Sequence, residues 1–231
     1  MHRVDDLIQN DTVDAQPDIV YKSQHTVTLT MKTFHPDGFN PNKRYPCVII
    51  INGGCGPSIR LPQNYVKQVD SWCTLLSGHN FIATYFYWRY KHPDDIQDAV
   101  QYICKNGKKL SIDETRLCVI TFSRGVETGI KQLLLLKPKT IKRIVAYYGK
   151  LPSELNDHNE IPSLFVAMAE NDNYFDKNCN DGIITALRRK KATVALHVHE
   201  TGNHFFDMEN DDPRTGEIIR KTIDFITSAF K

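Results

Sequence analysis

The stretch LCVITFSRGVETG, residues 117–129, reads first as a buried strand and then as the start of a helix. Its first six residues are almost all apolar, and a helical spacing of apolar positions follows as far as the proline at 138. Ser123 therefore falls at a sharp strand-to-helix turn, where its hydroxyl is exposed beside the free N–H groups of the first helical turn. Such a turn needs small residues two positions before and after the serine. Gly125 meets this need, whereas Thr121 stands where glycine is commonest.

The composition is that of a globular protein without a strong charge. The chain has 231 residues, of which 41% are hydrophobic and 24% are charged, and its formal net charge is +2. We therefore expect one domain over residues 1–231, with the polar residues 1–18 loosely ordered. So small a net charge gives no reason to expect nucleic acid or an anionic membrane as a partner.

Targeting and cysteine patterns favour the cytoplasm. No window approaches the roughly 18 consecutive apolar residues of a membrane span, and the N-terminus is too acidic for a secretory signal peptide. The six cysteines form no CxxC pair and no metal-ligand spacing, so we expect free thiols in a reducing compartment. We accordingly expect a cytoplasmic monomer or homodimer that needs no cofactor and no metal.

Apolar runs and helical patterns alternate along the chain. Val27, Leu29 and Met31 alternate with polar residues, which predicts an antiparallel strand, whereas the later runs are apolar on both faces, as in parallel sheets. This alternation predicts an α/β fold with a mostly parallel, doubly wound sheet, helices on both faces, and ligands at the carboxyl ends of the strands. The later strands are predicted at 47–51, 81–88, 117–122, 143–148, 163–169 and 193–199, and the helices at 62–78, 93–107, 124–138, 179–191 and 212–230.

A glycine-rich loop follows the first of these buried strands. The loop is INGGCGPS, residues 51–58, and its glycines allow backbone N–H groups to approach an anion closely. It lacks the GK[ST] ending of a phosphate-binding P-loop and the GxGxxG pattern of a dinucleotide site. Backbone donors at this strand end could therefore serve an oxyanion, although a plain tight turn has the same composition.

An acid and a histidine follow the serine in the chain, each just past a predicted strand. The acidic loop is AMAENDNYFD, in which Asp172 is the best-placed carboxylate and Glu170 and Asp176 compete with it. Asp176 also reads as the N-cap of the helix that follows. His204 lies in the GNHF loop after the 193–199 strand. The order Ser…Asp…His on strand ends is typical of one fold in particular.

From about residue 23 onward the sequence resembles the α/β-hydrolase superfamily, most closely its dienelactone-hydrolase-like and small-esterase branches. HPDGFNPNKRYPCVIIINGG is similar to the oxyanion segment, and NGKKLSIDETRLCVITFSRG to the segment that leads to the nucleophile. AYYG, AMAENDNYFD and NHFF are similar to the later strand, acid and histidine loops. The resemblance implies an α/β-hydrolase fold with little or no cap, and a small-molecule ester, lactone or thioester as substrate.

The resemblance also assigns roles to residues. It implies Ser123 as nucleophile, Asp172 as acid and His204 as base, acting through an acyl-enzyme intermediate. The implied oxyanion donors are the backbone N–H of Arg124 and one from the loop, drawn from Gly53, Gly54 and Cys55. Dienelactone hydrolases proper use a cysteine nucleophile, and this chain departs from them in having Ser123.

Aromatic residues at strand ends are candidates for the substrate pocket. We expect Tyr147, Tyr148, Tyr174 and Phe205 to contact substrate, and Tyr85, Tyr87 and Trp88 fall at a neighbouring strand end. The connection over residues 149–162 is short, which leaves little chain for a lid and predicts small or short-chain acyl groups.

Two other functions are consistent with parts of the sequence. His197 and His199 project from one face of a strand, near His204 and Asp207, and such a group could hold a divalent metal for a metal-assisted hydrolase. Because a fold alone does not prove activity, the chain could instead be a non-catalytic binding protein built on a hydrolase fold. The complete set of serine, acid and histidine favours the serine hydrolase over both.

Overall fold

One eight-stranded sheet runs through the computed structural model, which describes residues 2–8, 15–24, 26–54, 61–136, 140–158, 160–176 and 178–230. The strands lie in the order β1-β2-β4-β3-β5-β6-β7-β8. β1 pairs with β2, and β2 with β4, in antiparallel fashion, while all the other pairs are parallel. The mostly parallel sheet expected from the sequence is therefore confirmed. The strands are β1 (Ile19–Gln24), β2 (Val27–Phe34), β3 (Tyr45–Ile51), β4 (Ile82–Phe86), β5 (Ile112–Phe122), β6 (Ile141–Tyr147), β7 (Ser163–Ala169) and β8 (Val194–His199).

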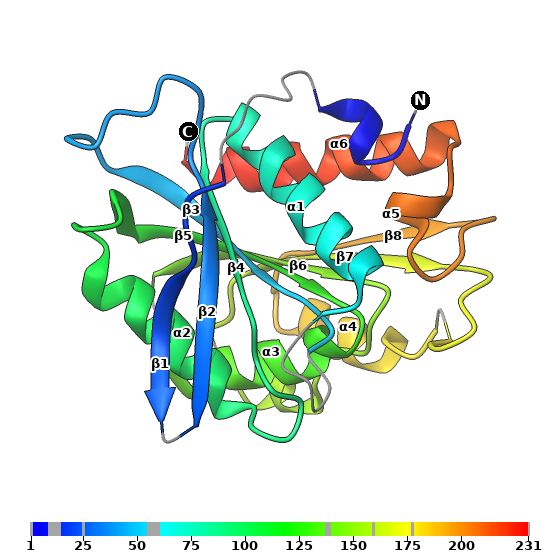
Figure 1. Cartoon of the computed structure of the whole chain (residues 1–231). Coiled ribbons are helices and arrows are strands. Elements are labelled where there is room, and N and C mark those ends of the chain that lie inside the picture. Colours follow the sequence, from blue (N-terminus) through cyan, green and yellow to red (C-terminus); the bar gives the residue numbers. More distant parts are fainter. Residues whose placement is uncertain are drawn as a thin grey trace.

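Helices cover both faces of the sheet (Figure 1). α1 and α6 pack on one face, where Val69, Trp72 and Ile223 join the first hydrophobic cluster. α2, α3 and α4 pack on the other face and form the second cluster. The helices are α1 (Gln63–Gly78), α2 (Asp94–Asn106), α3 (Arg124–Leu136), α4 (Asp181–Arg189), α5 (Phe206–Glu209) and α6 (Pro213–Thr227), with 3₁₀ turns at Asp5–Leu7, Ser153–Asp157 and Ser228–Phe230.

Strand β5 shows why a run that is apolar on both faces forms a central strand. Cys118, Ile120 and Phe122 point into the α1/α6 cluster, while Leu117 and Val119 point into the cluster on the opposite face. All five side chains are fully buried. Ser123 directly follows Phe122 and therefore lies at the carboxyl end of this central strand, between the neighbouring ends of β3 and β6.

Residues 2–8 lie in the segment that was expected to be loosely ordered, but they pack against the core of the protein. Val4 has no exposed surface and belongs to the core cluster of α1 and α6. Its N–H donates to the carbonyl of Asp207 in α5 over 3.0 Å, and Asp5 pairs with Lys67 on α1 over 2.7 Å. The antiparallel strand predicted from Val27, Leu29 and Met31 is β2, which forms a hairpin with β1.

No helix within the described ranges is long and apolar enough to cross a membrane. The five cysteines in those ranges are free thiols, as expected. Burial raises the pKa of Cys118 to about 12, so this thiol stays protonated and unreactive.

Candidate active site

Ser123 occupies a strained turn between β5 and α3. Its φ of 54° lies in the left-handed region, and its N–H donates to the carbonyl of Tyr147 over 3.0 Å. Gly125 is needed here because a Cβ at that position would lie 2.2 Å from the carbonyl oxygen of Asn52. Thr121 fits in place of glycine because its hydroxyl donates to the carbonyl of Val145 over 2.9 Å.

His204, in the loop after β8, lies between the serine and an acid. Its Nε2 is 3.0 Å from Ser123 Oγ, and its Nδ1 is 2.8 Å from Asp172 Oδ2. The imidazole side chain is 10% exposed and the Asp172 side chain is not exposed at all. The three residues singled out in the sequence, which lie on three separate loops, thus meet at the carboxyl edge of the sheet.

The Asp172 carboxylate is held in its ionised form. Its Oδ1 accepts the N–H of Tyr174 over 2.7 Å and that of Phe175 over 3.1 Å. Burial alone would raise the pKa of Asp172, but the hydrogen bonds from His204 and from these two N–H groups outweigh it, and the pKa lies below its ordinary value. A negative charge is therefore fixed beneath the imidazole.

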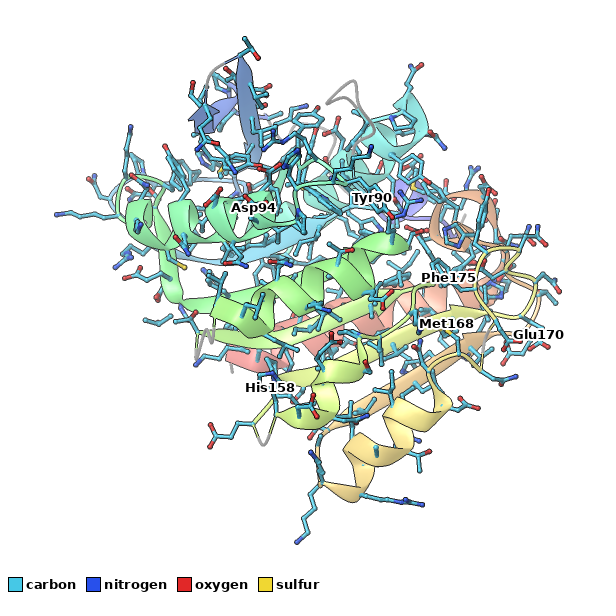
Figure 2. All side chains as sticks on the ribbon, turned by 90° about the horizontal axis from the view of Figure 1, so that it is seen from below. Tyr90, Asp94, His158, Met168, Glu170 and Phe175 are labelled. Atoms are coloured by element: carbon cyan, nitrogen blue, oxygen red, sulfur yellow. The ribbon has the colours of Figure 1, made fainter. Side chains whose placement is uncertain are left out.

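The two competing acids lie elsewhere. Asp176 is exposed, and its Oδ1 accepts the N–H of Asn178 in a tight turn over 2.7 Å. It is not the predicted N-cap, because α4 begins only at Asp181 with Asn180 at the cap. Glu170 is exposed directly after β7, and Figure 2 shows it at the periphery of the molecule.

The glycine-rich loop brings backbone donors beside Ser123. A Cβ built on Gly53 would lie 3.9 Å from the Ser123 Cβ, so the Gly53 backbone reaches the serine. Gly54 is not available as a donor, contrary to expectation, because its N–H donates to Asn52 Oδ1 over 2.8 Å. The Arg124 N–H opens α3, where first-turn N–H groups lack helical partners. Cys55 lies outside the described residues.

Asn52 and Trp88 shape this loop, and Asn52 was not singled out as a site residue. The Asn52 side chain is fully buried and also donates from Nδ2 to the carbonyl of Phe86 over 3.2 Å, which ties the loop to the end of β4. Trp88 packs against Gly54, whose φ is +87°, and a Cβ there would lie 2.7 Å from the indole. A polar residue ending an apolar run, just before two glycines, was the available signal for Asn52.

Aromatic rings surround the imidazole. The Tyr174 ring is 4.8 Å from His204, and Tyr174 is 77% exposed, which leaves it open to a ligand. The Phe175 ring stacks 6.0 Å away, and Phe205 packs edge-on against Tyr65 at 4.9 Å. Tyr90, which lies toward the same side of Figure 2 as Phe175, sits under the Arg124 guanidinium at 4.4 Å.

The expectation that Tyr147 and Tyr148 contact substrate is wrong. Both are fully buried in the α1/α6 core. The Tyr147 hydroxyl shares a hydrogen bond with Thr222 over 2.7 Å, and the Tyr148 hydroxyl donates to Asp207 over 2.9 Å. Both rings point into the space between sheet and helices instead of above the sheet edge.

The histidines of β8 do not gather as metal ligands. His199 is fully buried, with Nε2 at 2.9 Å from Thr215 Oγ1 and 3.1 Å from Asp212 Oδ1. His197 stacks on Phe165 at 4.6 Å. Neither belongs to a group with metal-ligand spacing among the described residues.

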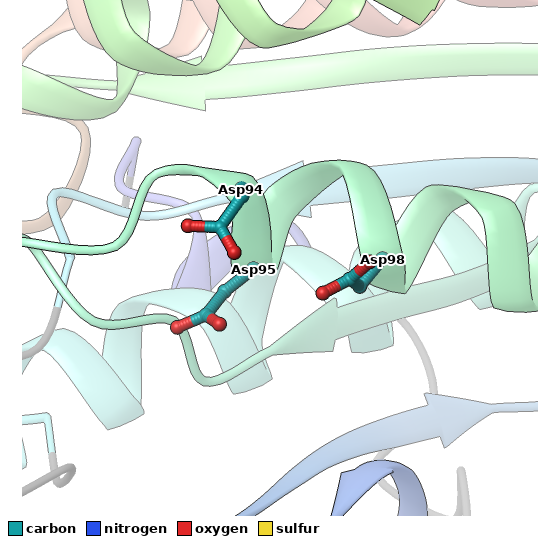
Figure 3. Close-up of side chains that lie close together, drawn as sticks. All are labelled: Asp94, Asp95 and Asp98. Carbon is teal, nitrogen blue, oxygen red and sulfur yellow. The ribbon is translucent and has the colours of Figure 1, made fainter. Parts of the chain in front are cut away.

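One carboxylate group of metal-ligand type does occur in the described ranges, at the start of α2. It comprises Asp94, Asp95 and Asp98 (Figure 3). The Lys22 ammonium lies among them, at 2.7 Å from Asp95 and 2.6 Å from Asp98, and Arg89 pairs with Asp95 over 2.8 Å. Two cations thus face three carboxylates, and the group joins β1 to α2 as an ion-pair network.

A mostly parallel sheet with a serine turn after β5, an acid after β7 and a histidine after β8 is the α/β-hydrolase arrangement. The model of the dienelactone hydrolase family matches residues 34–228, and the chain belongs to that family. It is a hydrolase that acts on ester bonds, as the sequence predicted. No curated protein matches the chain by sequence.

Solved structures of an esterase share the fold at low identity. The native form of Est2, from the Planctomycetes species Thermogutta terrifontis, has a TM-score of 0.77 at 12% identity, covering 95% of this chain and 93% of that one. Its butyrate-bound form has a TM-score of 0.77 at 13% identity, with 95% of each chain covered. Esterase 2 of the same organism, phosphorylated by paraoxon, has a TM-score of 0.72 at 13% identity, with 91% of each chain covered.

Proposed function

We propose that this protein is a serine esterase in which Ser123 attacks the ester carbonyl, His204 transfers protons and Asp172 holds the histidine. The single observation that carries the proposal is the bridging imidazole, 3.0 Å from Ser123 Oγ and 2.8 Å from Asp172 Oδ2. In this arrangement Nδ1–H donates to the carboxylate, and the lone pair on Nε2 faces the serine hydroxyl.

The steps follow from that tautomer. His204 Nε2 takes the proton of the Ser123 hydroxyl as Oγ bonds to the carbonyl carbon, and the imidazolium is stabilised by the Asp172 charge. The tetrahedral oxyanion accepts the N–H of Arg124 and a second N–H from Gly53 or Cys55. The imidazolium then protonates the leaving alcohol, and water hydrolyses the acyl-enzyme by the same proton transfers in reverse order.

We assign the substrate to esters of small or short-chain acids. The connection between β6 and β7 is short, and its described residues form one 3₁₀ turn at Ser153–Asp157 and no large apolar cap. The rings of Tyr174 and Phe205 pack beside His204. The structurally similar esterase has been solved with butyrate and with propionate bound, which supports acyl groups of this size here.

The test combines turnover with covalent labelling. Wild-type protein should hydrolyse p-nitrophenyl butyrate and be phosphorylated by paraoxon once per chain, at Ser123, because an activated serine attacks the phosphorus and expels p-nitrophenolate. Ser123→Ala should lose both reactions, while Ser153→Ala, at an exposed serine outside the site, should keep both. Thermal melting shows whether the variants are folded. Undiminished turnover by well-folded Ser123→Ala would overturn the serine mechanism.

A further inference from the structure

A second buried carboxylate lies three residues after His204. Asp207 in α5 has no exposed surface, and its side chain accepts three hydrogen bonds. Trp72 Nε1 and Gln68 Nε2, both from α1, donate to Oδ2 over 2.8 Å and 2.9 Å. The Tyr148 hydroxyl, from the end of β6, donates to Oδ1 over 2.9 Å. The mechanism proposed above uses none of these groups.

The groups around Asp207 are arranged as donors to its carboxyl oxygens. An indole N–H can only donate, and the hydroxyl and amide hydrogens here point toward the acid. The Gln68 amide also contacts the Tyr148 hydroxyl, so the three side chains form one connected network. Burial raises the pKa of Asp207, while the hydrogen bonds from Trp72, Gln68 and Tyr148 oppose this rise. A buried polar network of this kind fixes its members in one arrangement.

The network reaches the imidazole through the Tyr148 ring. This ring stands edge-on to the His204 ring, with centroids 4.6 Å apart. Tyr148 itself and Phe205, the residue after His204, both have left-handed backbone conformations, with φ of 36° and 76°. Strained conformations of this kind persist only where the surrounding contacts over-determine them. The hydrogen bond to Asp207 supplies such a contact for Tyr148, and the carbonyl of Phe205 accepts the N–H groups of Met208 and Glu209 in α5, the helix that carries Asp207.

We propose that Asp207 is a positioning residue for His204: it clamps the Tyr148 hydroxyl and the turn after His204, and so holds the imidazole in line with Ser123 and Asp172. The proposal rests on the serine-esterase mechanism above. Asp207 acts from both sides of the imidazole, through the backbone on which His204 is carried and through the Tyr148 ring that packs against it. Misplacing the imidazole slows proton transfer without weakening substrate binding.

The test compares two neighbouring tyrosines. Tyr148→Phe keeps the ring but removes the hydroxyl bound by Asp207, whereas Tyr147→Phe removes the equally buried bond to Thr222, which lies away from the triad. Tyr148→Phe should lower kcat for p-nitrophenyl butyrate roughly 10- to 100-fold with KM unchanged, the range that a small misplacement costs. Tyr147→Phe should lower the melting temperature to a similar extent and leave kcat as in wild type.

A second readout does not depend on turnover. The proton that His204 Nδ1 shares with Asp172 should give a low-field NMR resonance in the wild type and in Tyr147→Phe, and a broadened or shifted one in Tyr148→Phe and in Asp207→Asn. If Asp207→Asn does not fold, Tyr148→Phe carries the test. A wild-type kcat together with an unchanged resonance in Tyr148→Phe would overturn the proposal. Failure of wild-type turnover, with the resonance still responding to Tyr148→Phe, would overturn the proposed function instead.

Discussion

Replacing Asp172 by asparagine should separate the chemistry of the site from its structure. Asparagine has the same shape, and its carbonyl oxygen can still accept the N–H groups of Tyr174 and Phe175. Its amide nitrogen then faces His204 Nδ1, which now lies 2.8 Å from a carboxylate oxygen. Because an amide N–H can only donate, Nδ1 must give up its proton and Nε2 must carry it. That tautomer has no lone pair to receive the proton of Ser123.

The expected loss is large. The wrong tautomer and the missing negative charge together cost about 10⁴ in kcat where a triad aspartate is replaced by asparagine, which corresponds to about 5.4 kcal/mol of transition-state stabilisation. Water does not replace the lost acceptor, because the imidazole is only 10% exposed and the acid is not exposed. Stability should change little, because the loop keeps its two backbone hydrogen bonds.

The assay measures kcat for p-nitrophenyl butyrate in Asp172→Asn and in Asp176→Asn, with melting temperatures for both. Asp176→Asn is the matched control, because the exposed Asp176 caps only the local turn at Asn178, and asparagine caps that turn equally well. If Asp176→Asn proves the crippling change and Asp172→Asn the mild one, the assignment of the acid is refuted and the triad must be rebuilt around Asp176.

Three further outcomes are expected. Gly125→Ala should cost about 3 kcal/mol in urea unfolding, because its Cβ would lie 2.2 Å from a backbone carbonyl oxygen, whereas Gly182→Ala, with open space around it on α4, should gain about 0.5–1 kcal/mol; equal effects would contradict this. Burial alone would raise the pKa of Asp95, but hydrogen bonds from Arg89 and its neighbours lower it below its ordinary value, so its contribution to stability is present above pH about 4 and is lost as the pH falls through the folded-state pKa. The free energy of unfolding should therefore decrease less between pH 7 and pH 3 in Asp95→Asn than in Asp98→Asn. Across p-nitrophenyl esters of increasing acyl length, rates should fall beyond roughly eight carbons, given a pocket of ordinary volume, and a maximum on long chains would disprove the open-site argument.

The fold and the meeting of Ser123, Asp172 and His204 could be predicted because each rests on local signals. A short run that is apolar on both faces is typical of a central parallel strand, and Gly125 marks the turn after it. The carboxyl ends of parallel strands share one edge, so residues just past three of them come close together.

Side-chain direction at strand ends could not be predicted. Tyr147 and Tyr148 end β6, and nothing local decides whether such rings rise above the sheet edge or pack beneath α1 and α6. The decision comes from distant partners: Asp207 lies 59 positions from Tyr148 and 139 from Gln68. Val4 is a similar case: it shares a short polar segment with Leu7 and Ile8, and so short a stretch does not say which part of the fold it packs against.

The folded domain begins earlier in the chain than the region that matches the family. The family match begins at residue 34, the last residue of β2. A hydrolase trimmed to the matched residues, for grafting or chimera building, would lose β1 and nearly all of β2. It would leave β4 as a bare sheet edge, open to pairing with other chains. It would also lose the buried Val4, whose N–H holds the carbonyl of Asp207. Residues 2–8 and the β1–β2 hairpin are thus part of the scaffold that carries the catalytic loops, and a redesigned version should keep them.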